Sequence, residues 1–356
     1  MGCLGRPIRV LVVDDSAFMR KILTDLLSQD PEVTVVGTAR DGLDALERVE
    51  ALAPDVVTLD VEMPRLDGVG TLRELMRRRP LPVVMVSSLT REGAETTIRA
   101  LAAGAVDFVA KPSGAISLDM AKVAAELVAK VKAASRARPR VAAEPEPAGP
   151  GPVRVPTMPA AFSRVGTAEG VVVIGCSTGG PGALHQVVPR LPRDLAAGVL
   201  VVQHMPPGFT RSLADRLNEI SPLSVREAQT GEPIVPGTVL VAPGNYHMLV
   251  DEHRRIRLNQ DPPLHGVRPA VDRTLESAAA VFGRHTLAVI MTGMGYDGAR
   301  GVAMVRRAGG RAIAEDESTC VVYGMPKVVI ETGNADRIVP LGQIGQAIVE
   351  MAPSLG

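Results

Sequence analysis

Aromatic residues are scarce in this 356-residue chain, which has five Phe, three Tyr and no Trp. Its hydrophobic cores must therefore be built from Val, Leu, Ile, Ala and Met, within a hydrophobic share of 46%. A chain of this length is expected to form about two domains, and that share is ample for two cores.

Cysteines and long apolar runs are scarce as well. Cys3, Cys176 and Cys320 are odd in number and show no C-x-x-C spacing, which argues against a disulfide framework and against structural zinc. No apolar stretch approaches the roughly 20 residues of a membrane span, and no secretory apolar segment precedes the first expected strand. We therefore expect a cytoplasmic protein that does not insert into a membrane.

A surplus of either charge is also missing, because 39 Lys and Arg balance 39 Asp and Glu. Contacts with phosphates require positive charge, and nothing after Glu169 resembles a basic recognition helix. The composition thus argues against nucleic acid and against anionic membranes as partners.

Alternating strand and helix patterns fill two parts of the chain. In residues 1–133, five apolar runs such as IRVLVV and DVVTLDV each precede an amphipathic segment, which predicts a parallel sheet with helices on both faces. Residues 134–168 are rich in Pro, Ala and Arg and predict an extended linker. Residues 169–356 resume the alternation with runs such as VVVIG and HTLAVIMTG. The expected fold class is α/β, with two doubly wound parallel sheets.

Carboxylates follow two of the expected N-terminal strands. Asp14 and Asp15 come directly after VLVV, and Asp60 comes after VVTL. The carboxyl ends of parallel strands share one sheet edge, so three carboxylates are expected to converge there and to favour a Mg²⁺ ion. Ser87 and Lys111 end later strands, and their hydroxyl and ammonium groups equip this edge to accept a phosphoryl group. Each residue taken alone is also compatible with a helix cap or a solvated loop.

The motifs VVDDSAFMRKIL, TLDVEMPRLDG, VMVSS and GAVDFVAKP closely resemble the receiver domain of bacterial two-component response regulators, over residues 6–132. The resemblance implies a flavodoxin-like fold, phosphorylation of Asp60 by a CheA-type histidine kinase, and a cis Lys111–Pro112 bond. Phe108 falls at the position of an aromatic switch residue and is equally compatible with a core role. The implied Mg²⁺ ligands are Asp14, Asp15, Asp60 and the main chain of Glu62, and the implied switch residues are Ser87, Lys111 and Phe108.

The sequence GCSTG within VVVIGCSTGGPGA places Ser177 between an apolar run and a proline-led helix. It fits G-x-S-x-G, a strand–turn–helix elbow that exposes a serine hydroxyl near a helix N-terminus. A helix cap is a second interpretation, whereas a phosphate-binding loop lacks both the glycine spacing and the lysine that it needs. Cys176 is the alternative nucleophile, but a cysteine with apolar neighbours is usually a small buried residue.

A nucleophilic serine needs a base, and the base usually needs an orienting carboxylate. His204 ends the run GVLVVQH and Asp297 follows HTLAVI, so both are expected at the sheet edge that carries Ser177. His247 is the rival base, although it lies further from its strand end. The other histidines are expected in packed or surface roles, and they are His185, His253, His265 and His285.

Several long motifs, in order from about residue 170 onward, closely match the catalytic domain of the chemotaxis protein-glutamate methylesterases, the CheB family. They are IGCSTGGP, VVQHMPPGFTRSLADRL, VAPGNYHM, RPAVDRTLESAA, MTGMGYDGARG and EDESTCVVYGMPK. The resemblance implies a Rossmann-like fold with Ser177 as nucleophile, His204 as base and Asp297 as orienting carboxylate. It also implies that the Met294 amide helps form an oxyanion hole and that Thr178 supports the site.

The same resemblance implies hydrolysis of glutamate γ-methyl esters on cytoplasmic helices of chemoreceptors, with release of methanol and no cofactor, and deamidation of receptor glutamines. We expect the unphosphorylated receiver to pack over the Ser177 edge of a monomeric chain, and phosphorylation of Asp60 to weaken that packing. The sequence is also compatible with a second class, a docking protein whose C-terminal domain has lost catalysis.

Overall fold

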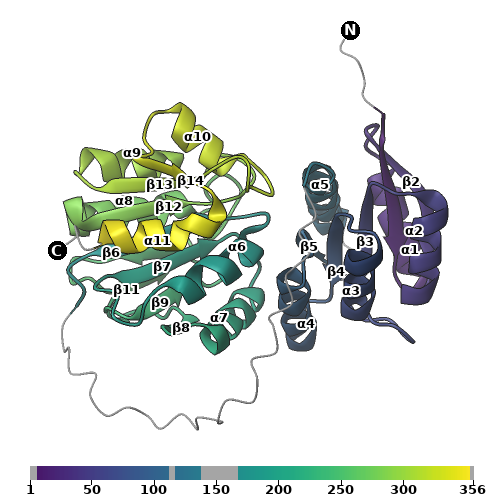
Figure 1. Ribbon diagram of the computed structural model, residues 1–356, viewed down its shortest axis with the longest axis horizontal. Coiled ribbons are helices and arrows are strands. Elements are labelled where there is room, and N and C mark those ends of the chain that lie inside the picture. Colours follow the sequence, from purple (N-terminus) through teal and green to yellow (C-terminus); the bar gives the residue numbers. More distant parts are fainter. Residues whose placement is uncertain (1–5, 112–116, 138–166, 353–356) are drawn as a thin grey trace.

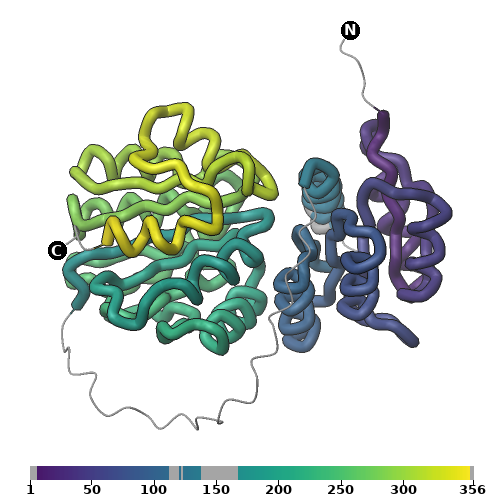
Figure 2. The backbone as a smooth tube through the Cα atoms, viewed as in Figure 1, coloured from purple at the N-terminus to yellow at the C-terminus, as the bar shows by residue number. Residues whose placement is uncertain are grey.

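The computed structural model describes residues 6–111, 117–137 and 167–352. Figure 1 shows two α/β lobes, and Figure 2 follows the chain from the purple-to-blue N-terminal lobe into the teal-to-yellow C-terminal lobe. Most of the predicted linker lies outside the described residues, and so does Pro112 of the predicted cis bond. Within the described ranges, every helix is too short or too polar to span a bilayer.

The N-terminal lobe contains a five-stranded parallel sheet in the order β2-β1-β3-β4-β5. The chain builds this sheet in one direction from β1 to β2 and then in the other direction from β3 onward, so the order reverses between β1 and β3. Its elements are β1 (Ile8–Val13), α1 (Ala17–Leu27), β2 (Val33–Ala39), α2 (Gly42–Leu52), β3 (Val56–Asp60), α3 (Gly68–Arg78), β4 (Val83–Ser87), α4 (Arg91–Ala102), β5 (Asp107–Ala110) and α5 (Ser117–Ala134).

Helices cover both faces of this sheet, as the continuous apolar runs predict. Val10 and Val12 of β1 belong to a buried cluster with residues of α1 and α5. Leu11 and Val13 belong to another cluster, which includes residues of α2, α3 and α4. Successive side chains of a strand point to opposite faces, so a strand that is apolar throughout is buried on both sides.

The C-terminal lobe contains a seven-stranded parallel sheet in the order β14-β13-β12-β6-β7-β9-β8 and a separate antiparallel pair, β10-β11. The order reverses between β6 and β12. Its elements are β6 (Val171–Cys176), α6 (Gly180–Val187), η1 (Val188–Arg190), β7 (Gly198–Gln203), α7 (Phe209–Ile220), β8 (Ser224–Glu227), β9 (Thr238–Val241), β10 (His247–Val250), β11 (Ile256–Asn259), α8 (Val271–Phe282), η2 (Gly283–His285), β12 (Thr286–Ile290), α9 (Ala299–Arg307), β13 (Arg311–Glu315), α10 (Met325–Glu331), β14 (Arg337–Val339) and α11 (Leu341–Met351).

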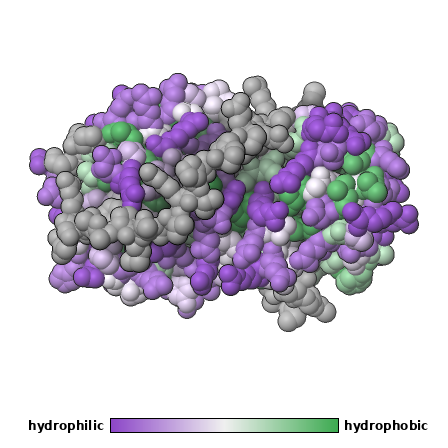
Figure 3. Space-filling view, turned by 60° about the horizontal axis from the view of Figure 1, so that its bottom comes forward, coloured by the Kyte–Doolittle hydropathy of each residue, from purple (hydrophilic) through white to green (hydrophobic). Residues whose placement is uncertain are grey.

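The two lobes share a hydrophobic contact. Helix α4 packs on α6 and α7, and Leu101 of α4 belongs to the same buried cluster as Leu184 of α6. The rings of Phe108 and Phe209 stack across the boundary, with centroids 4.4 Å apart and planes 22° apart. Figure 3 shows a mostly hydrophilic face on which hydrophobic residues come into view between the lobes. Burial of this apolar surface holds the lobes together.

Candidate active site

The acidic residues predicted to meet at the carboxyl edge of the N-terminal sheet do so. Asp14 follows β1, Asp60 ends β3, and both side chains are buried, whereas Asp15 is exposed. Carboxylate oxygens of the three residues lie within 4.8 Å of one another. The Lys111 Nζ lies 2.7 Å from Asp60 Oδ2 and 3.1 Å from Asp14 Oδ2. The cluster therefore sits where the strand order reverses, which is where open α/β sheets bind ligands.

Negative charge exceeds positive charge in this cluster. Burial raises the pKa of Asp60 to about 6, and the charge of Asp14 adds to that effect against the opposing influence of Lys111. The same two carboxylates outweigh burial and raise the pKa of Lys111, which keeps its ammonium charged. An oxygen-rich site with surplus negative charge fits a Mg²⁺ ion. A shallow cavity beside the cluster is lined by Asp15 and Glu62.

The remaining predicted receiver residues lie close to this edge. Ser87 is buried at the end of β4, and its hydroxyl donates to the carbonyls of Ser88 and Gly93, at 3.2 and 3.1 Å. Phe108, the predicted switch residue, is 2% exposed and therefore also has a core role. Its ring is held between the ring of Phe209 and the ammonium of Lys130, which lies 5.0 Å from the ring centroid.

The predicted elbow carries Ser177 from the end of β6 to the start of α6. The amide of Ser177 donates to the carbonyl of Thr292 at 3.0 Å, which ties the elbow to the loop after β12. Both glycines of the motif are required by their surroundings. A Cβ on Gly175 would lie 2.5 Å from Val271 Cγ1, and Gly179 has a φ of 78°, in the left-handed region that favours glycine.

Cys176, the alternative nucleophile, points into the protein interior. Its side chain is fully buried, its thiol lies 3.1 Å from Gln203 Oε1, and burial raises its pKa. The Gln203 Nε2 donates to the carbonyls of Ser177 and His204 at 3.0 Å each. A buried thiol is a poor source of thiolate, so this arrangement disfavours Cys176 as a nucleophile. Gln203, which no sequence pattern singled out, joins the ends of β6 and β7.

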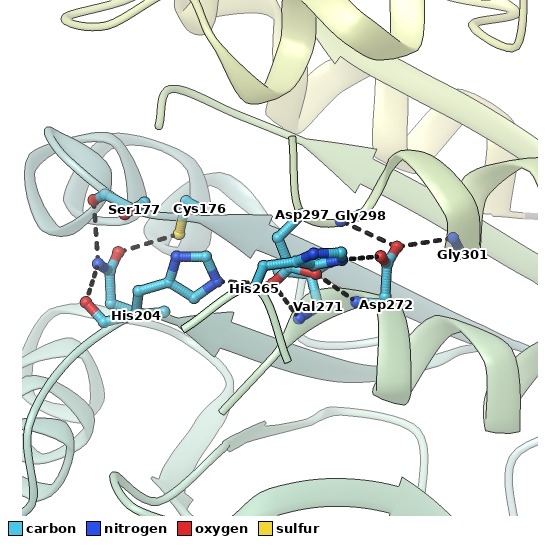
Figure 4. A network of polar contacts seen from close by, with 10 residues as sticks. Cys176, Ser177, His204, His265, Val271, Asp272, Asp297, Gly298 and Gly301 are labelled. Carbon is cyan, nitrogen blue, oxygen red and sulfur yellow. Dashed lines mark hydrogen bonds and ion pairs between the residues drawn. The ribbon is translucent and has the colours of Figure 1, made fainter. Parts of the chain in front are cut away.

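His204 and Asp297 form a direct pair. The His204 Nε2 lies 2.8 Å from Asp297 Oδ2. Figure 4 shows the His204 ring between Asp297 on one side and Cys176 and Ser177 on the other. Because Nε2 faces the carboxylate, it carries the proton, and Nδ1 keeps the free lone pair. The structure therefore brings together the three residues that the strand-end argument selected.

Asp297 is buried and held by three donors. Besides His204, the amides of Val271 and Asp272 donate to its oxygens, at 2.6 and 3.0 Å. Burial alone would raise the pKa of Asp297, but these hydrogen bonds outweigh burial and lower it. Asp297 consequently stays ionised and fixes the orientation of the His204 ring.

A second His–Asp pair, absent from the sequence argument, lies beside the first. Buried Asp272 accepts hydrogen bonds from the amides of Gly298 and Gly301, at 3.0 and 2.7 Å, and pairs with His265 Nε2 at 3.0 Å. The His265 ring also meets Tyr296 edge-on, with centroids 4.6 Å apart. His265 was expected in a packed or surface role, yet its turn brings it to the wall of the site.

His247, the rival base, lies outside the crevice of the site. It begins β10, its side chain is 1% exposed, and its Nε2 is 3.2 Å from the carbonyl of Pro262. Burial is the main cause that lowers its pKa. Its environment is that of a packed structural residue.

The candidate active site opens into a crevice of about 540 Å³ between the lobes. Both lobes contribute to its walls, because α5 and Asp107 of the N-terminal lobe face the elbow. Met294 is 44% exposed in this crevice, and among the described residues no acceptor is found for its amide. Thr178 is 4% exposed, and its carbonyl accepts a hydrogen bond from Thr292 Oγ1 at 2.9 Å. From the C-terminal lobe the lining residues include Ser177, Thr178, His204, Met205, His265, Arg268, Met294, Tyr296 and Asp297.

Comparisons with known proteins give the class of each lobe, a response regulator receiver and a methylesterase. Residues 10–121 match the response regulator receiver domain family, and residues 172–348 match the CheB methylesterase family. A protein-glutamate methylesterase/protein-glutamine glutaminase of Symbiobacterium thermophilum is 66% identical over 96% of each chain, and one of Thermotoga maritima is 48% identical over 97% of this chain and 99% of its own. The crystal structure of the Thermotoga maritima CheB methylesterase catalytic domain is 48% identical and covers 51% of this chain and 97% of its own, with a TM-score of 0.50. The chain therefore belongs to the CheB family of protein-glutamate methylesterases/protein-glutamine glutaminases, with an N-terminal receiver domain.

Proposed function

We propose that this CheB-family enzyme is a phosphorylation-controlled serine hydrolase acting on glutamate γ-methyl esters of chemoreceptors, for adaptation in chemotaxis. The observation that carries the proposal is the His204–Asp297 pair beside Ser177 in one crevice. Hydrolysis of the ester releases methanol, and deamidation of a receptor glutamine is the same acyl transfer with ammonia as leaving group.

In the proposed mechanism, Ser177 Oγ attacks the ester carbonyl while His204 accepts its proton at Nδ1. Asp297 holds the opposite ring nitrogen at 2.8 Å and stabilises the imidazolium that forms. His204 then gives the proton to the departing methanol. Water activated by the same imidazole attacks the acyl-enzyme and restores Ser177, so the reaction needs no cofactor.

The oxyanion of the tetrahedral intermediate needs donors that are already in place. The Met294 amide suits this role because Met294 lines the crevice and its amide has no acceptor among the described residues. Thr178 supports the loop that carries it, because its carbonyl accepts from Thr292, two residues before Met294. Removal of one such donor typically lowers kcat by about 10² to 10³.

In the receiver, we propose that Asp60 accepts a phosphoryl group from a CheA-type histidine kinase. Asp14, Asp15, Asp60 and the Glu62 carbonyl would hold Mg²⁺, which supplies neutralisation of charge on the phosphoryl oxygens. Lys111, 2.7 Å from Asp60, would contact those oxygens once the group is transferred. Ser87 and Phe108 complete the proposed switch, Ser87 at the end of β4 and Phe108 at the boundary between the lobes.

The contact between the lobes supports an inhibited state without phosphate. The Phe108–Phe209 stack and the packing of α4 on α6 and α7 keep the receiver against the crevice that contains Ser177. Phosphorylation of Asp60 would move Phe108 and weaken this contact. Receptor access then increases as the lobes separate.

The proposal divides the chain into a receiver at residues 1–133, a Pro-rich linker at 134–168 and a catalytic domain at 169–356. The strand orders support a flavodoxin-like receiver and a Rossmann-like catalytic domain with β8 added at one edge. The enzyme would act in the cytoplasm as a monomer on receptor cytoplasmic domains, without nucleic acid partners and without membrane insertion.

Release of methanol from methylated receptor membranes tests the proposal. The phosphorylated chain should release methanol, and Ser177→Ala should lower the rate at least 10³-fold because the nucleophile is lost. Cys320→Ser is the matched control, since it also changes a small side chain in the same domain but lies outside the crevice lining. Binding to receptors without methanol release would support the docking-protein alternative instead.

A further inference from the structure

Two helices beside the His204–Asp297 pair begin without a side-chain cap of their own. Helix α8 follows Ala270 and helix α9 follows Gly298, and neither residue provides a side-chain acceptor for the first amides of its helix. Those amides have no partner within the helix, and a buried amide without an acceptor costs free energy. Their acceptors must therefore come from elsewhere in the fold.

Two aspartates supply these acceptors crosswise. Asp297, just before α9, accepts from the amides of Val271 and Asp272 at the start of α8. Asp272, in the first turn of α8, accepts at Oδ1 from the amides of Gly298 and Gly301 at the start of α9. Figure 4 shows both carboxylates among these donors. Each aspartate thus caps the helix of the other, so the position of Asp297 is tied to that of Asp272.

His265 completes this arrangement on the side of the crevice. Its Nε2 lies 3.0 Å from Asp272 Oδ2, the oxygen that does not accept from α9, and its ring meets Tyr296 edge-on. The side chains of His265 and Asp272 are 23% and 1% exposed, and of the two only His265 lines the crevice. His265 therefore joins the first turn of α8 to the loop that carries Met294 and Asp297.

We propose that Asp272 and His265 are positioning residues, which hold the loop of residues 291–298 in the geometry that catalysis needs. This inference rests on the proposed function, in which the loop supplies Asp297 and the Met294 amide. Asp272 fixes the end of the loop at the start of α9, and His265 fixes Asp272 from the side of the crevice. Such contacts affect kcat, because a misplacement of about 1 Å can cost on the order of 10²-fold in rate.

Asp272→Ala is the first variant, because it removes the acceptor of both α9 amides. In the phosphorylated full-length chain, kcat for methanol release from methylated receptor membranes should fall by about 10- to 100-fold. KM should stay the same, since Asp272 does not line the crevice. Rates are compared per folded enzyme, with the folded fraction taken from urea titrations.

Asp272→Asn is the conservative variant. Its side-chain oxygen can still accept from both α9 amides, and the His265 ring can move its proton to Nδ1 and accept from the new NH2 group. If these hydrogen bonds position the loop, Asp272→Asn should restore most of the kcat that Asp272→Ala loses.

Asp251→Ala is the matched control for the loss of an aspartate cap. Asp251 also accepts from two backbone amides of the C-terminal lobe, those of His253 and Arg255, but it lies outside the crevice lining. This variant should leave kcat and KM unchanged. His265→Ala, at a partly exposed position, is the second test and should lower kcat at unchanged KM, with His253→Ala as its control.

The tautomer of His204 gives a readout that a loss of stability would not change. Nitrogen NMR distinguishes an imidazole protonated at Nε2 from one protonated at Nδ1, and His204→Gln identifies the signal. The wild type should show the Nε2-protonated ring, as its contact with Asp297 requires. Asp272→Ala and His265→Ala should show a mixture of tautomers, whereas Asp251→Ala should match the wild type.

Unchanged kcat in folded Asp272→Ala would overturn the inference, and so would equal losses in Asp272→Ala and Asp272→Asn. If Asp272→Ala does not fold, His265→Ala decides: a lower kcat with mixed tautomers of His204 supports the inference. A higher KM at unchanged kcat would overturn it, because His265 would then bind substrate. Failure of the proposed function looks different, because the phosphorylated wild type would then release no methanol, whatever the tautomer of His204.

Discussion

Both lobes place their sites where the strand order of the sheet reverses, but they shift the pKa of a buried carboxylate in opposite directions. Asp60 and Asp14 lie where the order reverses between β1 and β3, and Ser177 and Asp297 lie where it reverses between β6 and β12. Asp297 accepts three hydrogen bonds and its pKa is lowered. Asp60 has Lys111 as its main partner, and burial raises its pKa to about 6.

The difference lies in the donors around each carboxylate rather than in its burial. Backbone amides that donate to Asp297 stabilise its charge permanently, which suits the role that we propose for it, the orientation of the His204 imidazole. Asp60 is left with unbalanced charge, which suits the cation binding and the transient phosphorylation that we propose for it. The following predictions test this contrast.

The largest expected effect is that of Asp297→Asn. The amide side chain keeps the shape but presents no charge to His204, and it favours the wrong tautomer of the ring. We expect kcat for methanol release to fall by about 10⁴ with little change in KM. Asp316→Asn is the control, because Asp316 is a partly exposed carboxylate of the same domain that lies outside the crevice lining. A loss below tenfold would mean that Asp297 does not orient the base.

A smaller effect is expected at the contact between the lobes. Phe209→Ala removes one ring of the stack with Phe108, and such aromatic pairs contribute about 0.5–1.5 kcal/mol beyond their area burial. The activity of the unphosphorylated chain on receptor membranes should therefore rise by roughly two- to tenfold. Phe18→Ala is the control, since Phe18 is 72% exposed in the receiver. Equal rates in Phe209→Ala and the wild type would mean that the Phe108–Phe209 stack does not contribute to the inhibition.

A third prediction concerns the pH dependence of stability. Because the pKa of folded Asp60 is raised to about 6 from an ordinary value of 3.8, the folded state binds its proton more tightly than the unfolded state. The unfolding free energy should therefore be larger at pH 5 than at pH 7.5, by on the order of 1–2 kcal/mol. Urea titrations of the wild type and of Asp60→Asn give this quantity as a difference, in which titrating groups that do not interact with Asp60 cancel.

Urea titrations with and without Mg²⁺ extend this test of the unfolding free energy. The ion should stabilise the wild type at pH 7.5, and this gain should shrink as the pH falls through about 6, because protonated Asp60 is a poorer ligand. Asp60→Asn should gain less from Mg²⁺ at pH 7.5. A gain that is independent of pH would place the bound cation elsewhere.

Residues at strand ends could be predicted from the sequence, since parallel strands deliver them to one edge. Asp14, Asp60, Ser177, His204 and Asp297 all followed apolar runs, and the structure places them in two clusters. The sequence could not predict which ring nitrogen of His204 pairs with Asp297, and the structure shows that it is Nε2.

Residues positioned by turns and helix starts could not be predicted in this way. His265 reaches the crevice because its turn adopts a left-handed conformation, with a φ of 55°, and Asp272 lies in the first turn of α8. Neither follows an apolar run. Strands β8, β10, β11 and β14 also escaped prediction, because runs of three or four residues such as RIV and SVRE carry no readable periodicity.

The stack of Phe108 on Phe209 also bears on how the signal ends. Opening the lobes brings both rings, which are 2% and 1% exposed in the closed form, into contact with water. In the proposed regulation, the open state is therefore higher in free energy once Asp60 has lost its phosphoryl group, and the lobes would close again without any further input. In the proposed regulation, the lifetime of the phosphoryl group on Asp60 would then set the duration of the response, and the aromatic contact would favour return to the closed form.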